Sequence, residues 1–201
     1  MDLFSVQSLI SSDGVHVFWA QFDSHLEVTE VQPKLRNDYV NAATDPNEKR
    51  RRFAVWRLLD CALLKLYGKG VADFDFERQV GGKWVCSEAN VHFSLSHSGN
   101  VVAVALFDRP VGVDVQSICE FERHNSMTFA RRTLTSSELA EYVSLPQQQK
   151  TDFLAEKWCA KESIFKLTDG SVFAPSTIAV CDKAQLFRVL NGEYILAVAT
   201  Q

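Results

Sequence analysis

The chain has 201 residues, of which 46% are hydrophobic, and a formal net charge of −4. This length and apolar content allow a buried core, in one domain or two closely packed lobes, and exclude an intrinsically disordered chain. No apolar run reaches the about 18 residues of a membrane span, and the start lacks the basic and apolar regions of a signal peptide. The acidic balance argues against general nucleic-acid binding. Five scattered cysteines without a Cys-x-x-Cys pair argue against a disulfide framework or zinc site and suit a reducing cytoplasm.

The first half of the chain predicts strands around one long helix. Alternating residues over 15–22 predict a strand, and apolar residues at helical spacing over 48–67 predict a helix. A short hairpin is expected at Gly81 and Gly82. Residues 91–116 then predict successive strands separated by short breaks.

The second half predicts two helices followed by a hairpin. Thr135 and Glu138 have the spacing of a capping box at the start of the first helix. A longer helix is expected over about 152–167, and Asn191-Gly192 between two apolar runs predicts a tight turn between strands. Strands with helices between them indicate an α+β fold with antiparallel sheets, and a boundary between lobes 1–109 and 110–201 is the most natural division.

The stretch Val-Gly-Val-Asp-Val-Gln is the first candidate for chemistry. In a strand its valines point to one face, while Gly112, Asp114 and Gln116 point to the other. A carboxylate and a carboxamide at this spacing can share a hard cation such as Mg²⁺, which prefers oxygen ligands. The alternative is a half-exposed strand whose polar face meets water.

The stretch Glu-Lys-Trp-Cys-Ala-Lys-Glu-Ser-Ile-Phe-Lys, residues 156–166, is the second candidate. Glu162 and Lys166 are four residues apart on a helix, which a surface ion pair explains by itself. If this helix packs across the Asp114 strand, Glu162 completes a metal site and Lys166 neutralises a phosphate bound there.

The stretch Phe-Ser-Leu-Ser-His-Ser-Gly-Asn, residues 93–100, is the third candidate. Small hydroxyls, backbone N–H groups and His97 at a glycine-broken turn suit phosphate oxygens, although a single histidine is also a common structural residue. No Gly-x-Ser-x-Gly motif surrounds the serines, which argues against a hydrolase nucleophile. The basic run at 48–52 is either a solvated helix face or a docking site for an anionic partner.

Taken together, in this order and spacing, the three stretches resemble the 4′-phosphopantetheinyl transferases of the surfactin-synthetase-activating type. The resemblance covers roughly residues 48–180, and Trp-x-x-Lys-Glu-Ser-x-x-Lys is its most specific motif. It implies two similar lobes related by a pseudo-twofold axis, usually in a monomer, with coenzyme A in the cleft between them. It also implies transfer of 4′-phosphopantetheine from coenzyme A to a serine of an apo acyl or peptidyl carrier protein, with Mg²⁺ and release of 3′,5′-adenosine bisphosphate.

The resemblance also assigns roles to residues of the second lobe. Asp114 and Glu162 would bind Mg²⁺, and Glu162 would be the base that takes the proton of the carrier serine. Lys166 would stabilise the charge that develops on the pyrophosphate, with Lys161 as a neighbouring support on the cofactor. Many members carry an acid where this chain has Gln116, which predicts a metal site with one fewer negative charge.

In the first lobe the resemblance places four residues on the nucleotide end of coenzyme A. Ser96 and His97 would hold the 3′-phosphate. Lys83 matches a glycine-lysine turn near the adenine nucleotide, and Arg57 matches an arginine of the first helix.

Two other functions are compatible with these motifs. One is a relative that binds coenzyme A or a nucleotide without catalysis, which Gln116 favours and the retained Asp114, Glu162 and Lys166 oppose. The other is a metal-dependent phosphohydrolase, which would need more carboxylate or histidine ligands than the chain places together.

Overall fold

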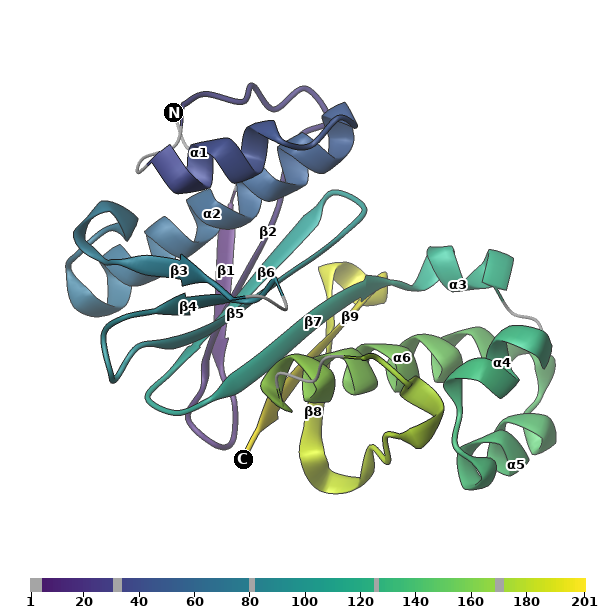
Figure 1. Cartoon of the computed structure of the whole chain (residues 1–201). Helices are drawn as coiled ribbons and strands as arrows, with labels where there is room; N and C mark the ends of the chain where they lie inside the picture. Colours follow the sequence, from purple (N-terminus) through teal and green to yellow (C-terminus); the bar gives the residue numbers. More distant parts are fainter. Residues whose placement is uncertain (1–4, 31–33, 80–81, 125–126, 169–171) are drawn as a thin grey trace. The chain divides into compact units, whose positions relative to one another are not determined.

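The computed structural model divides the chain into two compact units, Met1–Arg109 and Pro110–Gln201 (Figure 1). It describes residues 5–30, 34–79, 82–124, 127–168 and 172–201. Antiparallel sheets and helices occur in both units, which confirms the α+β class predicted from the sequence. Within the described residues no helix is long and apolar enough to cross a membrane.

The first unit is built on a four-stranded antiparallel sheet in the order β1-β2-β6-β5. Its strands are β1 (Val6–Ile10), β2 (His16–Gln21), β5 (His92–Ser98) and β6 (Val101–Phe107). A separate pair, β3 (Phe76–Arg78) and β4 (Trp84–Cys86), forms the hairpin predicted at Gly81 and Gly82, of which Gly81 lies outside the described residues. The strand predicted at residues 15–22 is confirmed as β2.

The long helix α2 (Pro46–Tyr67) covers this sheet, and the short helix α1 (Lys34–Asn41) packs against α2 (Figure 1). Asp45 caps the start of α2 by accepting hydrogen bonds from the backbone N–H groups of residues 47 and 48. Helix α2 ends at Gly68, whose φ of 68° suits glycine best. Trp56 and its helix neighbours fill the core together with Phe18, Phe93 and other buried residues of the strands.

The second unit contains a three-stranded antiparallel sheet in the order β7-β9-β8. Its strands are β7 (Val111–Ser117), β8 (Ala184–Val189) and β9 (Tyr194–Thr200). The last two strands form the hairpin predicted from Asn191-Gly192, where both residues have positive φ.

Four helices of the second unit lie in the described part of the chain: α3 (Ile118–His124), α4 (Met127–Thr133), α5 (Ser136–Ser144) and α6 (Gln147–Thr168). The predicted capping box is present at α5, because Thr135 and Glu138 each accept a hydrogen bond from the other's backbone. The helix expected over 152–167 is α6, which begins five residues earlier at Gln147. Helix α6 packs against β7 and β9, so some of its residues face Asp114 of β7 while others fill the apolar core.

Candidate active site

Strand β7 carries a buried carboxylate against helix α6. Val111, Val113 and Val115 alternate with Gly112, Asp114 and Gln116, as expected for a strand. Asp114 is 0% exposed, whereas Gln116 is partly exposed. The alternative of a polar strand face that meets water is therefore wrong for Asp114.

Gly112 explains why α6 comes so close to this strand. A Cβ atom at Gly112 would lie 1.9 Å from the backbone oxygen of Ser163 and 2.7 Å from the backbone nitrogen of Leu167. Both atoms belong to the α6 backbone, which cannot move aside as the end of a flexible side chain could. Only glycine allows this approach, and it is this approach that brings the polar face of α6 to Asp114.

Glu162 and Lys166 meet Asp114 at this contact. The Lys166 ammonium donates a hydrogen bond to Asp114 Oδ1 at 2.6 Å, and Lys166 Nζ lies 3.7 Å from Glu162 Oε2. Lys166 and Glu162 keep about a quarter of their side-chain surface exposed. Glu162 and Lys166 are therefore not only a surface ion pair of the helix, because Lys166 also bonds to the buried Asp114 of the neighbouring strand.

The surroundings of Glu162 shift its pKa strongly. Burial, and then the charge of Asp114, raises the pKa of Glu162 to about 8, although Lys166 and a hydrogen bond from Trp158 oppose this shift. Burial alone would lower the pKa of Lys166, but the charges of Asp114 and Glu162 raise it. Below them, burial and Asp114 raise the pKa of the fully buried Cys159 thiol, which keeps it neutral. Such perturbed groups at one place are typical of functional sites.

The oxygen atoms of this site fit a magnesium ion. Asp114 and Glu162 supply carboxylates, and Gln116 lies beside them because its Nε2 donates to Asp114 Oδ2 at 2.9 Å. Within the described residues no three His, Cys, Asp or Glu side chains gather as a metal group, so the set is limited to two carboxylates and a carboxamide. Magnesium accepts one or two protein carboxylates and keeps several waters, and a dication would relieve the repulsion between the two acids.

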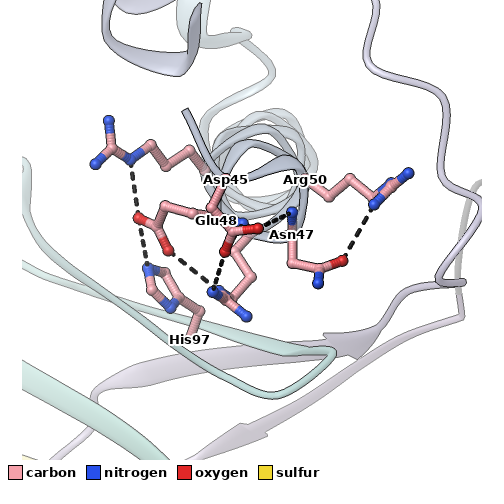
Figure 2. Close-up of polar contacts among 7 residues, drawn as sticks. Asp45, Asn47, Glu48, Arg50 and His97 are labelled. Carbon is pink, nitrogen blue, oxygen red and sulfur yellow. Dashed lines mark hydrogen bonds and ion pairs between the residues drawn. The ribbon is translucent and has the colours of Figure 1, made fainter. Parts of the chain in front are cut away.

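The first unit contains a separate cluster of charged side chains at the start of α2. Glu48 accepts hydrogen bonds from Arg51 Nε at 3.1 Å and from Arg52 Nε at 2.9 Å. His97 on β5 brings Nε2 to 3.9 Å from Glu48 Oε1, and Figure 2 shows these two side chains facing each other. Arg52 also donates to the backbone oxygen of Tyr39 and lies over its ring, which fixes the guanidinium. Arg51 also lies 3.6 Å from Asp45 Oδ2, so the cluster holds two arginines, two carboxylates and a histidine. Its guanidinium groups are of the type that binds an anion such as a phosphate.

The comparisons with known proteins agree with this chemistry. The family model described as the 4′-phosphopantetheinyl transferase superfamily matches residues 110–197, the stretch that holds Asp114, Glu162 and Lys166. Residues 110–197 of the chain are thus similar to the 4′-phosphopantetheinyl transferase superfamily. The match confirms the resemblance at the two motifs that it covers, those of Asp114 and of Glu162.

Several transferases align with the chain. A 4′-phosphopantetheinyl transferase of Bacillus subtilis is 28% identical over 119 residues, which cover 59% of this chain and 51% of that protein. The transferase HetI of Nostoc is 29% identical over 173 residues, covering 80% and 71%. A holo-[acyl-carrier-protein] synthase of Mycoplasma genitalium is 42% identical over 60 residues, covering 29% and 53%. The chain spans about half the length of the first of these relatives.

Three further residues that the sequence resemblance assigns to coenzyme A lie in the first unit. Arg57 is nearly half exposed and pairs with Asp60 one turn further along α2, at 3.6 Å. Lys83 directly precedes β4 and is partly exposed. Ser96 alternates with His97 along β5, so its side chain leaves the sheet on the opposite face, where it is 5% exposed.

Sequence reasoning did not assign Glu48, Arg51 and Arg52 individually to a site. The basic run at 48–52 was the available signal, because it marks concentrated positive charge in a mildly acidic protein. Which of its members face His97 follows only from the rotation of α2 over the sheet.

Lys161 occupies a different position from that expected of a cofactor ligand. Its side chain is 0% exposed, and its ammonium forms an ion pair with Glu138 Oε2 at 2.6 Å. It also donates to the backbone oxygens of Pro175 and Ile178. Burial lowers the pKa of Lys161, and Glu138 offsets part of that effect. Lys161 is thus engaged on all sides by the fold of its own unit.

Proposed function

We propose that this protein transfers 4′-phosphopantetheine from coenzyme A to a serine hydroxyl of an apo acyl or peptidyl carrier protein, with Mg²⁺, and releases 3′,5′-adenosine bisphosphate. The observation that carries the proposal is the group of Asp114, Glu162 and Lys166, assembled around a buried carboxylate in the part of the chain matched by the family model. The family's two similar lobes, its monomeric state and a cytoplasmic location are part of the same proposal.

Asp114 and Glu162 hold the magnesium ion in this proposal, and Gln116 contributes its carboxamide oxygen or orders a ligating water. When bound, the ion supplies charge neutralisation to the pyrophosphate of coenzyme A. Carboxylate oxygens, such as those of Asp114 and Glu162 that lie near Lys166, are the ligand type that magnesium prefers.

Glu162 takes the proton of the carrier serine, directly or through a water. The position of Glu162 beside Asp114 and Lys166 places a carboxylate where it can accept that proton. Lys166 then stabilises the charge that accumulates on the pyrophosphate during the displacement. Its present contacts with both acids hold its ammonium at this position.

The 3′-phosphate of coenzyme A binds at His97 together with Arg51 and Arg52, and Ser96 adjoins them through the backbone of β5. The cluster around Glu48 supports this assignment, since two guanidinium groups already converge on a carboxylate beside His97. Lys83 and Arg57 are assigned to the nucleotide by the family motif alone.

The function is tested by incubating the protein with coenzyme A, Mg²⁺ and a panel of apo carrier proteins, followed by intact-mass spectrometry of each carrier. We expect at least one carrier to gain the mass of one phosphopantetheine, and the gain to vanish with EDTA or when the acceptor serine is changed to alanine. If coenzyme A binds and no carrier in a broad panel gains mass, the protein is instead a non-catalytic coenzyme A-binding relative.

Gln116→Glu is expected to lower the Mg²⁺ concentration for half-maximal rate several-fold. The amide that now donates to Asp114 Oδ2 would become a third carboxylate, which repels Asp114 without metal and binds a dication more tightly with it. The measurement is the initial rate of carrier modification across a Mg²⁺ titration. Gln116→Ala serves as the control that removes the amide without adding charge, and an unchanged Mg²⁺ requirement in Gln116→Glu would place Gln116 away from the metal.

A further inference from the structure

Lys161 links three segments of the second unit at one buried point. Its ammonium contacts Glu138 of α5 at 2.6 Å and the backbone oxygens of Pro175 and Ile178 at 2.9 and 2.8 Å. An ammonium has three protons, so these three acceptors satisfy it completely. No donor capacity remains for a phosphate.

The partner carboxylate is itself fixed by a second bond. Glu138 Oε2 accepts a hydrogen bond from the backbone N–H of Thr135 at 2.8 Å, which closes the capping box of α5. The Glu138 carboxylate is therefore fixed at the start of α5 by Thr135, and it binds α6 through the ammonium of Lys161. A movement of α6 would therefore pull Lys161 away from a carboxylate that cannot easily follow it.

The lysine and the site glutamate are neighbours in sequence but serve different sides of α6. Successive helix residues point about 100° apart, so Lys161 can reach α5 and the 175–178 turn while Glu162 reaches Lys166 and Asp114. On the strand side the Ser163 backbone rests against Gly112. The rotation of α6 about its axis is thus fixed from both sides, and the position of Glu162 depends on that rotation.

We propose that Lys161 is a positioning residue of the transferase, which orients Glu162 toward Asp114 by holding α6 and does not contact coenzyme A. The inference rests on the proposed function, because Glu162 is the base and metal ligand there. It replaces the expectation that Lys161 supports the cofactor directly.

The test compares Lys161→Met with the double variant Lys161→Met/Glu138→Gln in the full-length protein. The single variant leaves Glu138 buried without its cation, whereas the double variant removes both charges and keeps an oxygen that can accept from Thr135. Both lose the tether to Pro175 and Ile178. Lys157→Met removes a lysine of the same helix that lies over the Phe153 ring, and it serves as the matched control.

Three quantities are measured: kcat at saturating coenzyme A and carrier, the Kd of coenzyme A, and the affinity for Mn²⁺ as a spectroscopic stand-in for Mg²⁺. We expect kcat to fall about tenfold or more in both variants while the Kd of coenzyme A changes less than about threefold. Mn²⁺ affinity is expected to weaken about fivefold in both variants. In Lys161→Met the loss of a nearby positive charge would by itself strengthen binding of a dication, so weaker binding there indicates a change of position and not of charge. The double variant loses one charge of each sign, so its net charge stays the same.

Two results would overturn the proposal. Wild-type kcat and Mn²⁺ affinity in the double variant would show that the pair only stabilises the fold. A coenzyme A Kd raised about tenfold at unchanged kcat would make Lys161 a cofactor ligand. If Lys161→Met does not fold, the double variant carries the comparison. If the wild-type protein modifies no carrier, the proposed function fails, while the Mn²⁺ series still decides whether Lys161 positions Glu162.

Discussion

Glu162→Gln is expected to lower kcat for carrier modification by about 100- to 10,000-fold, because it removes a general base and a charged metal ligand without changing the volume of the side chain. Coenzyme A should still bind, since the nucleotide end is assigned to His97, Arg51 and Arg52 of the first unit. The expected Mg²⁺ requirement is higher than that of the wild type. The measurements are single-turnover rates of carrier modification across a Mg²⁺ titration and the Kd of coenzyme A by calorimetry.

Glu156→Gln provides the matched control for this variant. Glu156 lies on the same helix but forms an exposed pair with Arg188, whose worth is about 0–1 kcal/mol. Its kcat should remain within about twofold of the wild type. A Glu162→Gln protein that keeps more than a tenth of the wild-type rate at saturating Mg²⁺ would exclude Glu162 as the base.

Gly112→Ala is expected to unfold or displace the contact between β7 and α6 and to abolish most of the activity. The new Cβ would stand 1.9 Å from the Ser163 backbone oxygen, so the helix must shift, and the distances among Asp114, Glu162 and Lys166 must change with it. Overpacking of a tight core contact costs about 1–3 kcal/mol, and we expect the upper end because only backbone atoms oppose the methyl group. The measurements are the unfolding midpoint in urea and kcat at a temperature where the variant is folded.

Gly192→Ala is the control for the general effect of replacing a glycine. Gly192 lies in the β8–β9 hairpin with a φ of +87°, and a methyl group added there would meet no neighbouring atom within 4 Å. Only backbone strain of about 1–2 kcal/mol is therefore expected, and kcat should stay near that of the wild type. If Gly112→Ala proves as mild as Gly192→Ala in both stability and kcat, close approach at Gly112 does not position the site.

Placing three ionisable side chains at one partly buried contact is expected to lower the stability of the folded protein. Burying Asp114 and placing Glu162 beside it raises the pKa of Glu162 and would be unfavourable without Lys166. An apolar set of side chains at the same positions would pack as well without desolvating charge. Retaining three ionisable groups at one contact between β7 and α6 is consistent with catalytic use.

Local structure was largely readable from the sequence. The end of α2 near residue 67, the Thr135–Glu138 capping box and the Asn191-Gly192 turn all depend on residues within a few positions of one another. The start of α6 was predicted five residues too late, because residues 147–151 are polar and carry no apolar periodicity. That turn is helical without contributing to the buried stripe.

The sequence by itself determined the α+β class, the resemblance to the transferase superfamily and the identity of the polar residues on β7 and α6, because strand and helix periods and short motifs are local properties of the chain. Only the tertiary structure decided how those residues are used. Lys161 and Glu162 are neighbours in the sequence, yet Lys161 contacts Glu138 and the 175–178 turn while Glu162 contacts Lys166. Likewise, only the structure shows which residues of the basic run at 48–52 lie near His97: Arg51 and Arg52 both bond to Glu48, which lies beside His97. Which side of a helix meets which neighbour is set by packing between segments distant in sequence, such as the glycine contact at Gly112, and no local pattern encodes that rotation.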